Sequence, residues 1–224
     1  MQLRWQIAQF FEMRWWRRYL SGKEKDAYLD WKKNYWRALL DRLDLSIPNG
    51  ATVLDAGCGP AGIFTVLPTN KVDALDPLLD QYERHLPHFR KSDYPQVHFI
   101  CAPLEQFEPE QPYEFVFCLN AINHVAELSL CLDRLQACTR PEGTLLLSVD
   151  THNYGWLKRI FRLVPGDILH PHQYDLQEYQ AMLLSRGFSI EQTVLLKKEW
   201  IFSYYLICAR HYTPTSRPFH LYFL

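Results

Sequence analysis

The sequence predicts an α/β fold built on a mostly parallel β-sheet, and three observations carry this prediction. From Ala51 onward, short apolar runs alternate with amphipathic helical stretches, the pattern of parallel strands that helices cover on both faces. A glycine-rich turn follows the first apolar run. The last two runs, 188–196 and 202–212, leave almost no room for a helix between them. We therefore expect them to form an antiparallel pair that closes the sheet.

The individual elements follow from hydrophobic periodicity. Helices are expected where apolar residues recur every three or four positions, and buried strands where short apolar runs stand between turn signals. The predicted helices are 3–20, 24–43, 78–89, 128–138 and 176–186, and the predicted strands are 52–56, 71–76, 97–102, 115–120, 144–149, 188–196 and 202–212.

Residues 1–47 differ in composition from the rest of the chain. They hold ten basic and six acidic residues and five of the seven tryptophans. The first predicted helix has no clean polar face, so we expect it to be covered on more than one side. We interpret residues 1–47 as an N-terminal helical lid or cap and residues 48–224 as the main domain. Extra core packing, peripheral membrane contact and self-association remain alternative explanations for the aromatic residues.

The overall composition excludes several classes of protein. The chain has 224 residues, 48% of them hydrophobic and 22% charged, which fits one globular domain with a modest appendage. The net charge of −1 gives no support for binding nucleic acid through a basic surface. The six cysteines form neither a CxxC nor a CxH pattern, so we expect no metal site and no disulfide framework. A reducing, cytoplasmic setting without a signal peptide or a membrane span fits best.

The chemistry is concentrated in the turn after the first predicted strand. Gly57, Gly59 and Gly62 satisfy a GxGxxG pattern, and Asp76 lies 19 residues beyond Gly57, at the end of the next strand. A backbone turn of this kind allows a ligand to approach closely, and an acid at that distance is placed to bind a ribose. Taken alone, the pattern is compatible with a dinucleotide or with another cofactor that contains adenosine.

Asp55 decides between these cofactors. It stands two residues before the first glycine, where a strand that binds a dinucleotide normally stays apolar. A carboxylate there would repel a pyrophosphate and would suit a cationic ligand. Capping of a neighbouring turn is the structural alternative for this residue.

The segment 53–59 resembles the first motif of class I S-adenosylmethionine-dependent methyltransferases, hydrophobic-hydrophobic-Asp/Glu-x-Gly-x-Gly. Later motifs follow in the family's order up to about residue 200. The resemblance implies S-adenosylmethionine as the cofactor. It also implies a Rossmann-like, doubly wound sheet of seven strands, mostly parallel with an antiparallel last strand.

The resemblance also assigns site residues, position by position. Pro103 stands where the family often has an aspartate, so the backbone of Leu104 is left to bind the edge of the adenine. Asn120 begins the loop where the methionine part of the cofactor meets the acceptor. The residues that the resemblance assigns to the cofactor are Asp55, Gly57, Gly59, Asp76, Pro77, Leu104 and Asn120.

The acceptor is predicted to be a small molecule, because residues 119–125 lack the motifs of nucleobase and protein arginine methyltransferases. Asn120, Asn123 and His124 instead resemble the loop of small-molecule methyltransferases, as does a histidine-bearing segment with His170 and His172. The expected acceptor is an apolar or aromatic metabolite, methylated on oxygen, nitrogen or carbon. His124, His170 and His172 are the candidate catalytic bases, although a loop histidine often only bonds to the backbone.

Two further functions remain open at this stage. The first is a methyltransferase-like binding or assembly subunit that no longer turns over. The second is a nicotinamide-dependent oxidoreductase, which Asp55 and the lack of a separate substrate domain disfavour.

Overall fold

The computed structural model describes residues 2–152, 174–200 and 202–212. The helices within these ranges are α1 (Gln2–Leu20), α2 (Lys25–Arg42), α3 (Leu79–His85), α4 (Leu128–Cys138) and α6 (Leu176–Leu184). The strands are β1 (Thr52–Ala56), β2 (Lys71–Leu75), β3 (Val97–Ile100), β4 (Tyr113–Cys118), β5 (Thr139–His152), β6 (Phe188–Lys198) and β7 (Phe202–His211).

The strands form one seven-stranded sheet in the order β3-β2-β1-β4-β5-β7-β6. Neighbours from β3 through β5 pair in parallel, whereas β7 pairs antiparallel with both β5 and β6. The strand order reverses between β1 and β4. The predicted Rossmann-like, mostly parallel sheet with its antiparallel closing strands is confirmed.

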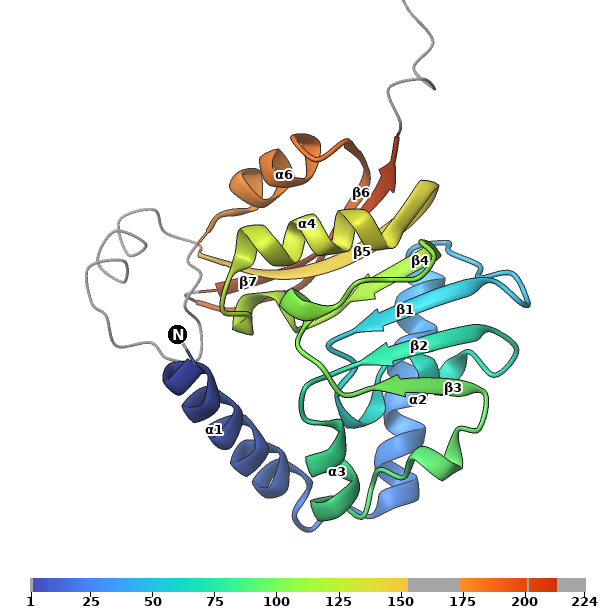
Figure 1. Cartoon of the computed structure of the whole chain (residues 1–224), viewed down its shortest axis with the longest axis vertical. Coiled ribbons are helices and arrows are strands. Elements are labelled where there is room, and N and C mark those ends of the chain that lie inside the picture. Colours follow the sequence, from blue (N-terminus) through green and yellow to red (C-terminus); the bar gives the residue numbers. More distant parts are fainter. Residues whose placement is uncertain (1, 153–173, 201, 213–224) are drawn as a thin grey trace, which may run out of the picture.

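Alternating side chains divide the core between the two faces of the sheet. Val53 of β1 belongs to one buried cluster with residues of α2 and α3, while Leu54 belongs to another with residues of α4 and α6. Figure 1 shows α4 and α6 in front of the sheet and α2 behind it. The strands are therefore covered on both faces, as their continuous apolar runs predict.

Helix α2 is one layer of this sandwich. Its N-cap, Glu24, accepts hydrogen bonds from the backbone N–H groups of Asp26 and Ala27, which satisfies two donors that no helical carbonyl reaches. Trp36 is buried and donates from Nε1 to the carbonyl oxygen of Ala61 at 3.0 Å. The division of the chain near residue 48 and the lid role of residues 1–47 stay predictions.

Helix α1 lies across the carboxyl edge of the sheet. The arrowheads of β1, β2 and β3 point toward it in Figure 1, and it contacts α3. In the part of the chain that the structure describes, none of the helices is long and apolar enough to cross a bilayer.

Several strands end earlier than the sequence predicts. The segment predicted as 71–76 ends at Leu75, the one predicted as 97–102 ends at Ile100, and the one predicted as 115–120 ends at Cys118. At each position the chain leaves the sheet to form a loop at the carboxyl edge. β5 begins earlier than expected, at Thr139, and includes Glu142 with a left-handed φ of 59°.

Candidate active site at the carboxyl edge of the sheet

The site is built where the strand order reverses, between β1 and β4. Loops that follow two such neighbours run to opposite faces of the sheet, and ligands bind in the crevice between them. The two loops touch at Gly57 and Ala121. A Cβ on Gly57 would lie 2.2 Å from the Cβ of Ala121, and Gly57 has a φ of 72°. Both the space and the backbone conformation therefore require glycine here.

The glycine turn is fixed to the neighbouring strand. The N–H groups of Gly57 and Cys58 both donate to the carbonyl oxygen of Leu75, at 2.7 and 3.1 Å. Gly59 has a φ of 58° and begins a short 3-10 helix, Gly59–Ala61. The turn thereby keeps its backbone close to the end of β2.

Asp76 lies directly after β2 and faces this turn. Its carboxylate accepts hydrogen bonds from the N–H of Gly59 at 3.0 Å and of Leu78 at 2.8 Å. The side chain is buried, and this burial, with the nearby Glu12 carboxylate, raises the pKa of Asp76 to about 7. A buried carboxylate without a fixed cation is suited to accept hydrogen bonds from a polar ligand.

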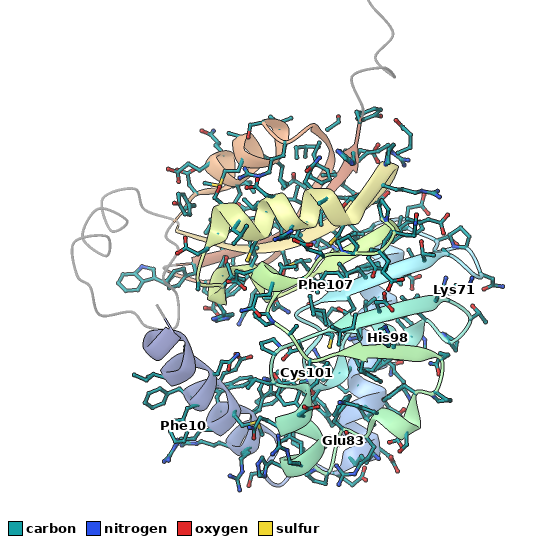
Figure 2. The ribbon with its side chains drawn as sticks, in the orientation of Figure 1. Phe10, Lys71, Glu83, His98, Cys101 and Phe107 are labelled. Atoms are coloured by element: carbon teal, nitrogen blue, oxygen red, sulfur yellow. The ribbon has the colours of Figure 1, made fainter. Side chains whose placement is uncertain are left out.

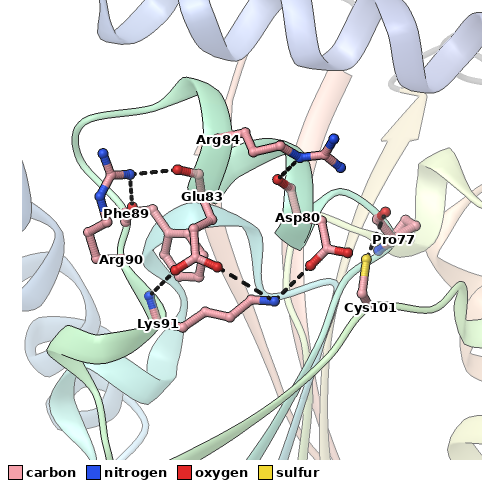
Figure 3. A network of polar contacts seen from close by, with 8 residues as sticks. All are labelled: Pro77, Asp80, Glu83, Arg84, Phe89, Arg90, Lys91 and Cys101. Atoms are coloured by element: carbon pink, nitrogen blue, oxygen red, sulfur yellow. Dashed lines mark hydrogen bonds and ion pairs between the residues drawn. The ribbon is translucent and has the colours of Figure 1, made fainter.

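The helix that follows Asp76 is held by a polar network, which Figure 3 shows. The ammonium of Lys91 lies 2.7 Å from Asp80 and 3.8 Å from Glu83, both on α3. Arg90 donates to the carbonyl oxygen of Glu83 at 2.7 Å. These contacts fix the start of α3 and with it the position of Asp76.

Asp55, near the end of β1, is also buried. Its carboxylate accepts a hydrogen bond from the N–H of Phe64 at 3.2 Å, in the 3-10 helix Ile63–Val66. A Cβ on Gly62 would lie 2.2 Å from an oxygen of Asp55, so the turn closes around the carboxylate. Burial is the main cause that raises the pKa of Asp55 to about 7. Asp55 therefore does bond to the neighbouring turn, as the alternative of a capping role predicts. Its role in binding a ligand stays a prediction.

Lys32 of α2 is a residue that the sequence reasoning missed. Burial lowers its pKa to about 8, and the Asp55 carboxylate opposes that shift. Its ammonium lies 4.4 Å from the ring centre of Trp36 and 5.5 Å from that of Tyr35. The ammonium of Lys32 and the carboxyl group of Asp55 thus lie beside the glycine turn.

Helix α1 contributes two more residues that the sequence reasoning missed, Glu12 and Trp16. The Trp16 ring lies 3.5 Å from where a Cβ of Gly59 would be, and it packs edge-on against Tyr82 with ring centres 6.1 Å apart. Burial raises the pKa of Glu12. Tyr82 is buried beside Glu12 and Asp76, and its hydroxyl opposes the rise in the pKa of both carboxyls. The inner face of α1 therefore covers the glycine turn and Asp76.

The loop after β4 carries the residues predicted to face the acceptor. Asn120 is exposed, has a left-handed φ of 56°, and donates from its backbone N–H to Ser148 at 2.6 Å. Asn123 is buried and accepts a hydrogen bond from the Tyr179 hydroxyl at 3.0 Å, so it ties the loop to α6. His124 is exposed, at the end of a 3-10 helix.

The remaining predicted positions lie farther along this edge. Pro77 directly follows Asp76, and its carbonyl oxygen accepts a weak hydrogen bond from Cys101 at 3.5 Å. Leu104 is buried and begins the 3-10 helix Leu104–Gln106, which follows β3. His170 and His172 lie outside the described residues.

The structure thus places the predicted cofactor residues at one edge of the sheet, with Asp55 near the end of β1 and the others on the loops that follow β1, β2, β3 and β4. Their ligand roles remain predictions. Within residues 2–152, 174–200 and 202–212, no group of three metal-binding side chains occurs.

Comparison with known proteins identifies relatives of this arrangement. A family described as "Methyltransferase domain" matches residues 28–193. The malonyl-[acyl-carrier protein] O-methyltransferase of Acetivibrio thermocellus is 27% identical over 136 residues, which are 59% of this chain and 47% of the relative. The ubiquinone biosynthesis O-methyltransferase of Rhodopseudomonas palustris is 30% identical over 141 residues, 58% of this chain and 54% of the relative. The chain spans about half the length of these curated relatives.

A solved structure extends the likeness over nearly the whole fold. Magnesium protoporphyrin IX methyltransferase from Synechocystis PCC 6803, solved with bound SAH, superposes with a TM-score of 0.58 and 21% identity. The match covers 91% of this chain and 94% of the other. The family match spans well over half of the sequence and includes the glycine turn and Asp76. The protein therefore belongs to the class I S-adenosylmethionine-dependent methyltransferase family.

Proposed function

We propose that the protein transfers the methyl group of S-adenosylmethionine to a small apolar or aromatic acceptor. The observation that carries this proposal is the pair of buried carboxylates at the ends of β1 and β2. Asp55 and Asp76 stand on either side of a glycine turn, and the N–H of Gly59 bonds directly to Asp76 at 3.0 Å. No phosphate group would be stable between two such carboxylates.

The residues fit the cofactor in charge and in shape. The proposed role of Asp76 is to accept hydrogen bonds from the ribose hydroxyls. Beside it, Gly57 and Gly59 have positive φ values and no side chains, and the N–H of Gly59 bonds to Asp76. The methionine part carries an ammonium and a carboxylate, which match Asp55 and Lys32. When bound, the cofactor supplies a methyl group on a positively charged sulfur.

The chain contributes alignment and exclusion of water. A methyl group moves by backside displacement, which needs the acceptor atom and the sulfur in line and little else. Trp16 and the inner face of α1 cover the turn and shield it from water. If the acceptor must lose a proton, we propose His124, in the loop after β4, as the base that accepts it.

The acceptor class rests on two lines of support. Relatives of the chain are named for acceptors attached to a carrier protein or belonging to ubiquinone biosynthesis, and both are O-methyltransferases, which favours a hydroxyl or carboxyl oxygen. Trp16 and Tyr82 supply an aromatic wall beside the turn, which suits an apolar ligand. We propose a cytoplasmic setting as well, since all six cysteines are free thiols.

A thermal-shift comparison tests the proposed function first. S-adenosylhomocysteine should raise the melting temperature in a concentration-dependent way, because a ligand that binds only the folded state stabilises it. NAD should leave the melting temperature unchanged. Stabilisation by NAD alone would favour the oxidoreductase instead. Transfer of labelled methyl groups to quinol and fatty-acyl acceptors then separates an active enzyme from a binding subunit that does not turn over.

A further inference from the structure

Helix α1 presents an unusual face to solvent. Between residues 8 and 20, the exposed side chains all fall within an arc of about 160° when the helix is drawn at 100° per residue. We call this set the outer face of α1. It consists of Phe10, Phe11, Arg14, Trp15, Arg17 and Arg18.

The aromatic residues of this face are too exposed to belong to the core. Phe10 is 64% exposed, Trp15 53% and Phe11 48%. The side chains of α1 that do pack inward, Met13 and Leu20, lie on the opposite side of the helix. Figure 2 shows Phe10 on the side of α1 that faces away from the sheet. Several large aromatic side chains exposed on one helix face mark a surface that binds a partner.

The charges on the outer face all have one sign. On the helical projection Arg14 and Arg18 lie between the aromatic residues and Arg17 lies beside Phe10, and the face has no acidic residue. Glu12, the single acidic residue of α1, lies on the inner side, where burial raises its pKa. The protein as a whole has a net charge of −1, so this positive patch is a local feature and does not reflect a basic protein.

We propose that the outer face of α1 docks the protein on an anionic membrane surface. Aromatic side chains with arginines between them suit the boundary between headgroups and acyl chains, where the rings enter and the guanidinium groups meet lipid phosphates. α1 is a single helix at the periphery of the molecule (Figure 1), so it can lie flat on a planar surface. The proposal does not depend on methyl transfer.

A second copy of the chain fits this face less well. In a two-fold symmetric interface the same patch meets itself, so three arginines of one copy would face three of the other. The outer face offers no carboxylate to pair with them. Anionic lipid supplies the missing negative charge.

A chain of ring contacts runs from the outer face toward α2, through the buried Tyr28. Trp15 stacks on Tyr19 with ring centres 4.8 Å apart, and Tyr19 contacts Tyr28, which contacts Trp31. Trp31 is 53% exposed. Tyr19, Tyr28 and Trp31 line a hollow of about 370 Å³ together with Lys23 and Glu24. Tryptophan, tyrosine and lysine side chains of this kind are typical of membrane interfaces.

Docking would have a direct consequence for the candidate active site. The inner side of the same helix holds Trp16 over Gly59, and an α-helix with its side chains is only about 10–12 Å across. The glycine turn would then lie within about one helix diameter of the bilayer. An apolar acceptor dissolved in the membrane would have a short path to it.

Co-sedimentation of the full chain with lipid vesicles tests the proposal. The protein should bind vesicles of phosphatidylcholine mixed with phosphatidylglycerol and bind weakly to phosphatidylcholine alone. High salt should release it, because the Debye length falls from about 10 Å at 0.1 M to about 3 Å at 1 M. Replacing Arg14, Arg17 and Arg18 with glutamine should weaken partition to anionic vesicles about fivefold for each arginine.

Two matched controls separate this face from general surface effects. A triple variant with Arg37→Gln, Lys71→Gln and Arg140→Gln removes as much charge elsewhere and should bind as the wild type does. Lys71 lies at the amino end of β2, far from Phe10 (Figure 2). Likewise Phe10→Ser with Trp15→Ser should weaken binding, whereas Leu184→Ser, exposed on α6, should not. Each variant must keep the melting temperature of the wild type, and Phe10→Ser alone replaces the pair if it does not.

Three results would overturn the proposal. The first is wild-type protein that remains in the supernatant with anionic vesicles. The control triple variant could lose as much binding as the arginine triple variant, which would indicate unspecific attraction. Sedimentation velocity without lipid could reveal a dimer that Phe10→Ser with Trp15→Ser abolishes while vesicles bind nothing, which would assign the face to a second copy.

Discussion

The backbone N–H of Gly59 donates a hydrogen bond to the carboxylate of Asp76 over 3.0 Å. This bond joins the turn after β1 to the end of β2, so the two strands present one preformed edge. Asp76 is consequently oriented before any ligand arrives, which reduces the entropy lost on binding. The predictions below concern the groups around this bond.

Affinity for S-adenosylhomocysteine should rise as pH increases from 5.5 to 7.5. Asp55 and Asp76 have pKa values raised to about 7, mainly by burial, and the ligand requires their ionised forms. Below its pKa, each carboxyl that must lose a proton for the ligand to bind raises the affinity by up to about tenfold per pH unit. Calorimetry across this range measures the slope, and Asp76→Asn should flatten it. A wild-type affinity that is independent of pH would contradict the assignment.

The stability of the ligand-free protein should change in the opposite direction. Because the pKa of each carboxyl is higher in the folded state than in the unfolded state, the folded state binds more protons between about pH 4 and pH 7. The free energy of unfolding from these two groups therefore falls as pH rises through that window. Urea denaturation at several pH values, compared between wild type and Asp76→Asn, isolates the contribution of Asp76.

Lys32→Met should weaken binding of S-adenosylhomocysteine by roughly tenfold, the loss of one charge-assisted contact to the carboxylate of the ligand. Binding of 5′-methylthioadenosine, which lacks the amino-acid part, should be unchanged. Lys33→Met is the matched control, since Lys33 pairs with Asp30 on the solvent side of α2. Equal losses for both ligands would instead show that Lys32 supports the fold.

His124→Ala should lower turnover by about 10²–10⁴ if the histidine acts as a base, with cofactor affinity retained. Transfer of a labelled methyl group to the true acceptor measures this. His98→Ala, an exposed histidine on β3, is the control and should keep full activity. Full turnover by the His124 variant would leave it a structural residue of the loop.

Removal of residues 1–22 should leave a folded protein that still binds S-adenosylhomocysteine but no longer methylates its acceptor. α2 keeps its own contacts, because Trp36 bonds to the turn after β1 at Ala61 and packs in one core cluster with Val53 of β1, whereas the cover provided by Trp16 is lost. Circular dichroism, calorimetry and the transfer assay measure fold, binding and turnover separately. Normal turnover by the shortened protein would refute the lid role of α1.

The sheet could be predicted from the sequence because its strands are continuous apolar runs. The glycine turn could be predicted because the positive φ values at Gly57 and Gly59 favour glycine, which the sequence shows directly. The sequence did not predict Lys32, Glu12 or Trp16, since these residues meet the carboxyl edge only through packing of α1 and α2. One signal was available for α1. Glu12 lies opposite the three arginines on a helical projection, which points an acid inward. The hydrogen bond from Phe64 to Asp55 could not be predicted, because it depends on how the turn folds back.

Calorimetric titration of S-adenosylhomocysteine into Asp76→Ala and Asp73→Ala tests the central claim most directly. Asp76 directly follows β2, whereas Asp73 lies within the strand and bonds to Tyr113 and His98. Asp76→Ala removes the charged acceptor for two ribose hydroxyls, worth at most about 1.5–3 kcal/mol for each bond. We predict a loss of affinity of at least tenfold for Asp76→Ala and almost none for Asp73→Ala. Unchanged affinity in Asp76→Ala would contradict the cofactor site described for this edge of the sheet.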